Sequence, residues 1–161
     1  MRVALVTGGG SGIGRSAALE LNKIDFTVYV VGRREEELIK TSSLATNNNH
    51  KIIPIKTDIT IGSQVIALFD KIKSDHGRID LLFNNAGMGA PRVPIEDLKE
   101  EDWRKTVDVN LTGSFLCSQQ AIKLMKNQSP QGGRIVNNGS VSAHSPRPVS
   151  YTHLRAHETL P

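Results

Sequence analysis

The sequence contains few of the features that mark secreted, membrane or nucleic-acid-binding proteins. Cys117 is its only cysteine, so no intramolecular disulfide can form, and a reducing, cytoplasmic location is expected. We expect this thiol to be a small buried residue of a helix rather than a reactive group. No apolar run approaches the roughly 20 residues of a membrane-spanning helix, and the first residues lack the apolar segment of an export signal. We therefore expect no membrane partner.

Aromatic residues and clustered charge are also scarce. Phe, Trp and Tyr make up 4% of the residues, and although the net charge is +4, Lys and Arg are spread along the chain. Nucleic-acid surfaces concentrate positive charge and often interleave it with stacking rings, so we expect no nucleic-acid partner. No metal site is predicted either. At 161 residues, the chain has room for one substantial domain.

Five short apolar runs predict buried strands. They are continuous rather than alternating, which is typical of parallel strands covered on both faces. Val3, Val28 and Ile53 follow one another at intervals of 25 residues, which accommodates one crossover helix between neighbouring strands. The predicted strands are Val3–Val6, Thr27–Val31, Ile52–Ile55, Leu81–Phe83 and Arg134–Val136.

Two longer segments have helical periodicity. Apolar residues between Ile61 and Ile72 recur at helical spacing, and Gly77 follows where a helix would stop. A longer helix is predicted from about Glu100 to Met125. The residues that it is expected to turn inward are Trp103, Val107, Leu111 and Met125.

Polar or glycine-rich segments follow all five strands. In chain order they read TGGGSGIG, GRR, TDI, NNAG and NNGS. The carboxyl ends of parallel strands meet at one edge of a sheet, where doubly wound α/β folds bind their ligands. We therefore predict an α/β fold with a doubly wound parallel sheet and a ligand site at this edge.

The first of these segments is suited to binding a pyrophosphate. Glycines without a Cβ let the backbone turn tightly and approach the ligand, whose charge is stabilised by amides at the start of the following helix. Ser11 and Ile13 are expected to contribute such amides. The loop fits the pattern TGxxxGxG, but it also fits the looser GxGxG of methyl-donor-binding Rossmann proteins, so the loop alone leaves both open.

Taken together, the glycine loop, NNAG at residues 84–87, Asn110 and Ser140 resemble the short-chain dehydrogenase/reductase family, and within it the members similar to 3-oxoacyl-ACP reductases. The resemblance covers Met1 to about Pro148. It implies a Rossmann-type sheet of strand order 3-2-1-4-5, truncated after the fifth strand, and makes residues 1–148 an incomplete NAD(P)-binding domain. The cofactor-binding residues that it implies are Gly8, Ser11, Gly12, Ile13, Gly14, Arg33, Asp58, Ile59, Asn85, Ala86 and Gly87.

The resemblance also assigns roles to individual residues. Asp58 would accept a hydrogen bond from the adenine amino group with Ile59 beside the ring, although a helix cap ahead of residue 61 is the alternative. Asn110 and Ser140 are the predicted catalytic residues. Asn110 would hold a water molecule of a proton relay, and Ser140 would bind the substrate carbonyl. For Asn110, an irregularity of the helix alone is the alternative.

The end of the second predicted strand indicates which cofactor is used. Gly32 stands where family members that prefer NAD carry an acid for the ribose hydroxyls, and Arg33 follows it. Arg33 can donate charge-assisted hydrogen bonds to a 2′-phosphate, so we expect NADP(H) to be preferred over NAD(H). The alternative, a solvent-exposed arginine at a helix start, stays open for Arg33 and carries more weight for Arg34.

The last residues depart from the family pattern. Family members carry a tyrosine with a lysine four residues later, whereas here Arg155 follows Tyr151, which lies 11 residues after Ser140, about two fewer than usual. The sequence from Val149 looks like a translated sequencing adapter. Residues 149–161 are therefore interpreted as a non-native tail and the chain as an N-terminal fragment, with a genuine divergent tail as the alternative.

For the full-length parent, the resemblance implies an NADP-dependent oxidoreductase that transfers a hydride between the nicotinamide and a small-molecule carbonyl or alcohol substrate. It also implies a homodimer or homotetramer. The fragment itself is expected to be inactive. A dinucleotide-binding sensor without catalysis is the main alternative, and a methyltransferase is a weaker one, because NNAG, Asn110 and Ser140 have no role there.

Overall fold

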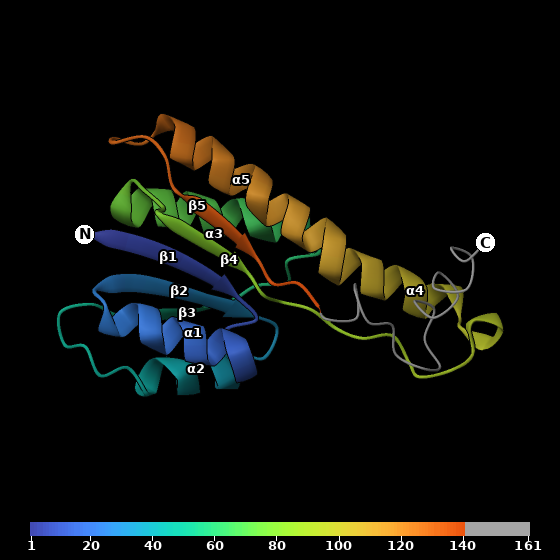
Figure 1. Ribbon diagram of the computed structural model, residues 1–161. Helices are drawn as coiled ribbons and strands as arrows, with labels where there is room; N and C mark the ends of the chain where they lie inside the picture. The colour runs from blue at the N-terminus through green and yellow to red at the C-terminus, as the bar shows by residue number, and fades with distance from the viewer. Residues whose placement is uncertain (141–161) are drawn as a thin grey trace, which may run out of the picture.

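The computed structural model describes residues 1–140, which form a five-stranded parallel sheet flanked by helices on both faces (Figure 1). The strand order is β3-β2-β1-β4-β5, as predicted. Each strand begins at or one residue before its predicted start and ends one residue after its predicted end. The strands are β1 Arg2–Thr7, β2 Phe26–Gly32, β3 Ile52–Lys56, β4 Leu81–Asn84 and β5 Arg134–Asn137.

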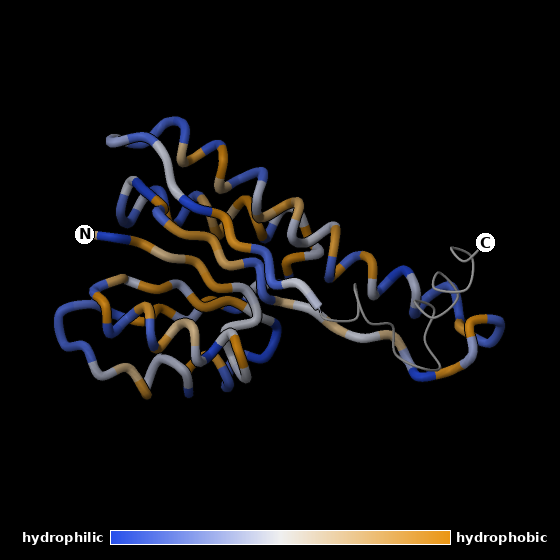
Figure 2. The backbone as a smooth tube through the Cα atoms, in the orientation of Figure 1, coloured by the Kyte–Doolittle hydropathy of each residue, from blue (hydrophilic) through white to orange (hydrophobic). Residues whose placement is uncertain are grey.

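The two faces of the sheet bury separate hydrophobic clusters. Alternate residues of β1 point to opposite faces, so that Ala4 and Val6 pack with α1 (Gly12–Lys23) and α2 (Glu35–Ser43). Val3 and Leu5 pack with α3 (Gly62–His76) and α5 (Gly113–Asn127). Figure 2 shows apolar residues running along the strands between these helical layers. Both faces are covered, which explains why the strands read as continuous apolar runs.

The helix predicted between Ile61 and Ile72 is confirmed as α3. Gly77 ends it in the left-handed region, with φ of 69°, where a residue with a side chain would be strained. Within residues 1–140, no helix is long and apolar enough to cross a membrane.

The single long helix predicted from Glu100 to Met125 is wrong. After a short turn, η1 (Ile95–Asp97), the chain forms α4 (Glu100–Val107), a π-helical turn η2 (Asp108–Thr112) and then α5. Trp103 and Leu111, which were expected to point inward, are 45% and 67% exposed. Figure 1 shows the reason, because α4 extends beyond the carboxyl ends of the strands and has no sheet beneath it. Met125 is buried as predicted.

The only cysteine lies in the core, as predicted. Cys117 is fully buried on α5, and burial raises the pKa of its thiol to about 12. The thiolate is the reactive form of cysteine, and it is scarce at neutral pH when the pKa is this high. Cys117 is therefore a packing residue rather than a nucleophile.

A buried tyrosine joins the sheet to the end of α3. The hydroxyl of Tyr29, which is fully buried on β2, donates to Oδ2 of Asp75 at 2.6 Å, and Nζ of Lys71 lies 3.0 Å from the same oxygen. The hydrogen bond from Tyr29, followed by that from Lys71, holds the pKa of Asp75 below its usual value. Asp75 therefore contributes stability that is present above the pKa of the unfolded carboxyl and is lost as the pH falls through the lower folded value.

We expect Tyr29→Phe to reduce the acid sensitivity of the fold. The variant lacks the hydroxyl that lowers the pKa of Asp75, so less stability depends on the charged carboxylate. The decrease in Tm between about pH 5 and about pH 2, followed by circular dichroism, should be smaller than in the unaltered chain. Asp70→Asn, at an exposed position of the same helix, serves as the control and should leave the decrease unchanged. An equal decrease in Tyr29→Phe and the unaltered chain would contradict this assignment.

Candidate functional site

The glycine loop joins β1 to α1 and contains two glycines with positive φ and a third where the backbone packs closely. Gly8 has φ of 67° and Gly12 has φ of 52°, conformations that favour glycine. A Cβ on Gly14 would lie 2.3 Å from the carbonyl oxygen of Gly8, so α1 can start against the loop only because residue 14 has no side chain. Gly14 therefore serves packing, whereas an ideal Cβ on Gly12 meets no atom within 4 Å and leaves the backbone open to a ligand.

Hydrogen bonds of Thr7 join the ends of β1 and β4. Its Oγ1 accepts bonds from the backbone N–H of Asn85 at 3.0 Å and of Ala86 at 2.9 Å. The side-chain amide of Asn85 donates to the carbonyl oxygen of Thr7 at 3.0 Å. In the sheet, β1 is followed by β2 on one side, whereas β4 is followed by β5 on the other side. Doubly wound folds bind their ligands at such a switch point.

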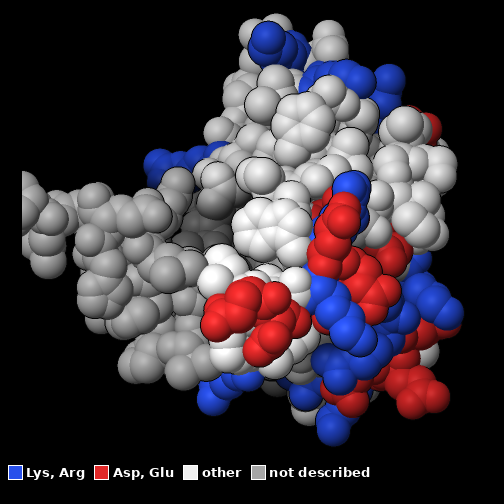
Figure 3. Space-filling view, turned by 90° about the vertical axis from the view of Figure 1, so that its right-hand side faces the viewer, with Lys and Arg blue, Asp and Glu red and all other residues white. Residues whose placement is uncertain are grey.

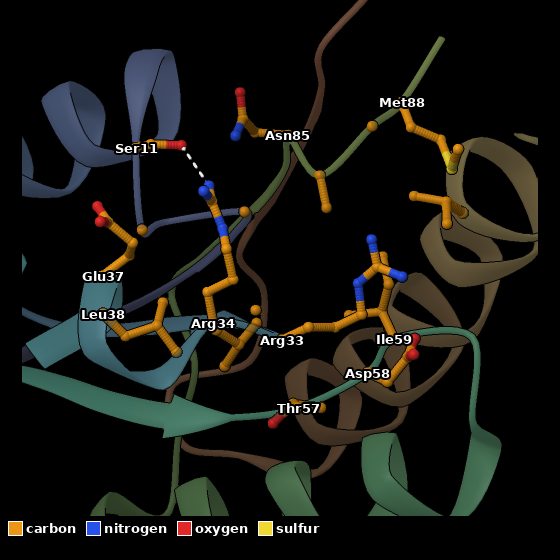
Figure 4. A pocket seen from close by; sticks show the side chains of 17 residues that line it. Ser11, Arg33, Arg34, Glu37, Leu38, Thr57, Asp58, Ile59, Asn85 and Met88 are labelled. Carbon is orange, nitrogen blue, oxygen red and sulfur yellow. Dashed lines mark hydrogen bonds between the residues drawn. The ribbon is translucent and has the colours of Figure 1, made fainter. Parts of the chain in front are cut away.

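A cavity of about 310 Å³ lies at the carboxyl ends of β1 to β4 (Figure 4). It brings together eight of the predicted cofactor-binding residues, namely Gly8, Ser11, Arg33, Asp58, Ile59, Asn85, Ala86 and Gly87. Gly12, Ile13 and Gly14 do not line it, and the side chain of Ile13 is 64% exposed. The cavity is also lined by residues that were not predicted as site residues, among them Leu38, Met88, Val109 and Thr57, the first residue of the TDI segment.

The two arginines after β2 both line the cavity. Nη2 of Arg34 donates to Oγ of Ser11 at 3.2 Å, and Figure 4 shows it reaching toward the glycine loop. Arg33 extends in another direction and lies beside Asp58 and Ile59. Arg34 is exposed and is the N-cap of α2, as the alternative for this residue expected, and its guanidinium also meets the glycine loop.

Asp58 makes a local turn and also lines the cavity. Its Oδ1 accepts bonds from the backbone N–H and the hydroxyl of Thr60, at 3.0 and 2.8 Å. The N-cap of α3 is Ile61, so Asp58 does not cap that helix directly. Side chains such as Asp stabilise turns in this way, and one carboxylate oxygen can serve the turn while the residue faces a ligand.

A second cavity of about 690 Å³ holds the two predicted catalytic residues. Asn110 and Ser140 both line it, together with residues 84–88 and part of α5. In the π turn, Oδ1 of Asn110 accepts from the backbone N–H of Met88 and Nδ2 donates to its carbonyl oxygen, each at 2.8 Å. Residues 85–88 line both cavities, so this segment is the wall between them.

The tyrosine and lysine of the family pattern have no counterpart in the described residues. Tyr29 is the only tyrosine within residues 1–140, and it is buried in the sheet with its hydroxyl bonded to Asp75. Tyr151, Arg155 and the tail interpreted as non-native lie outside the described part of the chain.

Two curated relatives align with most of the chain. A 3beta-hydroxysteroid dehydrogenase of Mediterraneibacter gnavus is 37% identical over 141 residues, which make up 88% of this chain and 50% of the relative. Dehydrogenase/reductase SDR family member 11 of Gallus gallus is 32% identical over 155 residues, or 95% of this chain and 60% of the relative. The chain thus spans between half and three fifths of the length of these relatives.

Solved structures with bound cofactors share the fold. An NAD+-bound xylitol dehydrogenase superposes with a TM-score of 0.86 at 29% identity, over 94% of this chain and 58% of that one. A metagenomic short-chain oxidoreductase in complex with NADP gives 0.86 at 25% identity, over 96% and 69%. The family model described as short chain dehydrogenase matches residues 2–152, which decides against a methyltransferase. The chain belongs to the short-chain dehydrogenase family.

Proposed function

We propose that this chain is the cofactor-binding part of an NADP(H)-dependent oxidoreductase acting on a carbonyl or alcohol substrate. The observation that carries the proposal is the cavity at the strand ends, where Arg34 meets the glycine loop and Arg33 lies beside Asp58 and Ile59. Gly32 ends β2 without the carboxylate that would favour the ribose hydroxyls of NAD. A 2′-phosphate would meet one or both guanidinium groups there.

The residues around the cavity are suited to a dinucleotide. Open backbone at Gly12, at the start of α1, suits the pyrophosphate, because helix N-termini bind anions. Asp58 and Ile59 offer a hydrogen-bond acceptor and an apolar surface for the adenine. When bound, the nicotinamide ring supplies or accepts the hydride. The segment around Gly87 would place it next to the second cavity.

Asn110 and Ser140 remain the proposed catalytic residues. The hydroxyl of Ser140 would hydrogen-bond the substrate oxygen in the second cavity. Both polar atoms of the Asn110 amide are engaged by Met88, so we propose that the backbone carbonyl of Asn110 in the π turn holds the relay water. This carbonyl also accepts a bond from Oγ of Ser114 at 3.2 Å, and a carbonyl oxygen has two lone pairs.

A dinucleotide-binding sensor is the second candidate. It is favoured by one observation, because neither tyrosine of the sequence, Tyr29 or Tyr151, is followed by a lysine four residues later.

Cytoplasmic location and assembly into a homodimer or homotetramer also stay proposals. Exposed apolar side chains of α5, Phe115 and Ile122, support self-association of the full-length protein.

We expect Arg33→Ala and Arg34→Ala each to weaken binding of adenosine 2′,5′-bisphosphate to the 161-residue chain. A charge-assisted hydrogen bond contributes about 1.5 to 3 kcal/mol, which corresponds to roughly a 10- to 150-fold loss. Binding of adenosine 5′-monophosphate should change less than about twofold, since it lacks the 2′-phosphate. Isothermal titration calorimetry measures both, and Arg104→Ala, at an exposed position of α4, is the control. Equal losses for the two ligands would refute the NADP(H) assignment.

We expect the 161-residue chain to reduce no carbonyl substrate with NADPH, because no tyrosine–lysine pair supplies the proton. Loss of general acid catalysis typically costs about 10²- to 10⁴-fold in rate. A chimera whose residues after Pro148 come from an intact family member should regain turnover, measured by NADPH absorbance with a panel of ketones. Turnover by the unaltered chain that disappears in Tyr151→Phe would instead show that the tail is native and catalytic.

A further inference from the structure

An ion pair lies beside the cavity without being part of the phosphate loop or of the proposed chemistry. Nη2 of Arg15 on α1 lies 2.6 Å from Oε2 of Glu37 on α2. The same nitrogen donates to the carbonyl oxygen of Gly10 in the glycine loop, and Nε donates to Oγ1 of Thr41 at 3.0 Å. Arg15 is therefore held by the loop and by two successive turns of α2.

The contacts of Arg15 are mostly buried. Its side chain is 20% exposed. Thr41 is fully buried, and its hydroxyl donates to the carbonyl oxygen of Gly9 at 2.9 Å. Arginine is suited to this position because its planar group presents several donors in a fixed geometry. The guanidinium thus defines where the Glu37 carboxylate lies.

Glu37 and Arg34 belong to the same part of the cavity wall. Both line it, since Arg34 is the N-cap of α2 and Glu37 lies in the first turn of this helix. The bond from Arg15 is the main cause that lowers the pKa of Glu37, with further contributions from the charge of Lys40 and, after it, that of Arg34. Figure 3, which looks onto the ends of the strands, shows acidic and basic side chains intermixed on one side of this face. Arg34 therefore has a carboxylate within its electrostatic range.

We propose that Arg15 is a positioning residue for cofactor selectivity, because it holds Glu37 away from Arg34 and leaves Arg34 available to an anionic group of the cofactor. Without Arg15, Lys40 and Arg34 are the remaining cations that act on the Glu37 carboxylate, and its pairing with Arg34 would compete with the ligand phosphate. In the structure, Arg34 instead reaches Ser11 of the phosphate loop (Figure 4). This inference rests on the proposed binding of NADP(H) and adds a residue that does not touch the cofactor.

A double-mutant cycle on the 161-residue chain tests this role, with adenosine 2′,5′-bisphosphate and adenosine 5′-monophosphate as the probes. We expect Arg15→Gln to weaken binding of the bisphosphate at least about fivefold and binding of the monophosphate less than about twofold. The cycle isolates the effect that Arg15 and Glu37 have on each other. Adding Glu37→Gln to Arg15→Gln should restore the bisphosphate affinity to within about twofold of the unaltered chain. Lys40→Gln is the matched control, because it removes one positive charge near Glu37 without removing the contact, and it should leave the ratio of the two affinities unchanged.

Two results would overturn the proposal. An equal loss of both probes in Arg15→Gln would mean that Arg15 only supports the loop, and failure of Glu37→Gln to restore binding would mean that the carboxylate does not compete. If Arg15→Gln gives no cooperative melting, Arg15→Lys replaces it, because an ammonium lacks the planar group whose separate nitrogens reach Thr41 and Glu37, and the same cycle applies with a smaller loss. If the unaltered chain binds both probes equally well, the proposed preference for NADP(H) is wrong. If it prefers the bisphosphate but the variants behave otherwise than expected, only the proposed role of Arg15 is wrong.

Discussion

The contact between the ends of β1 and β4 determines where this protein can bind a ligand. Thr7 is almost fully buried, and its single hydroxyl accepts the N–H groups of Asn85 and Ala86. Each such bond contributes only about 0.5 to 1.5 kcal/mol, but leaving these buried groups unpaired would cost more. The joint brings the turn after β4 against the loop after β1. The cavity forms because the connection after β1 leads toward β2 and the connection after β4 leads toward β5, on the opposite side of the sheet.

The close packing of glycines at this joint explains the shape of the cavity on the side of the glycine loop. A Cβ on Gly8 would lie 2.9 Å from Cα of Ala86, and a Cβ on Gly14 would lie 2.5 Å from Nδ2 of Asn85. The glycine loop is thus packed against the turn after β4 rather than suspended over the cavity. Real Cβ atoms do not approach other atoms this closely, so a side chain at either position would move the loop away from the joint.

The sheet and the edge at which the cavity lies were predictable from local pattern, whereas the eight lining residues were predicted from the resemblance to the family. Buried parallel strands read as continuous apolar runs, and polar residues at their carboxyl ends must converge at one edge. The long helix was not predictable, since periodicity alone cannot show that α4 passes beyond the sheet or that a π turn interrupts it at Asp108. The pairing of Arg15 with Glu37 depends on how α1 and α2 sit together, which no local pattern reports.

The π turn contacts the turn after β4, which lines both cavities. The amide of Asn110 spans both backbone groups of Met88, and a Cβ on Gly87 would lie 3.2 Å from Oδ1 of Asn110. An α-helical path through residues 108–112 would change the direction in which residue 110 points, because a π turn adds one residue to the turn. The irregularity of the helix is therefore how Asn110 reaches the wall that separates the proposed cofactor from the proposed substrate. The structure thus contains the helix irregularity that was one interpretation of Asn110, and the catalytic role of this residue stays a proposal.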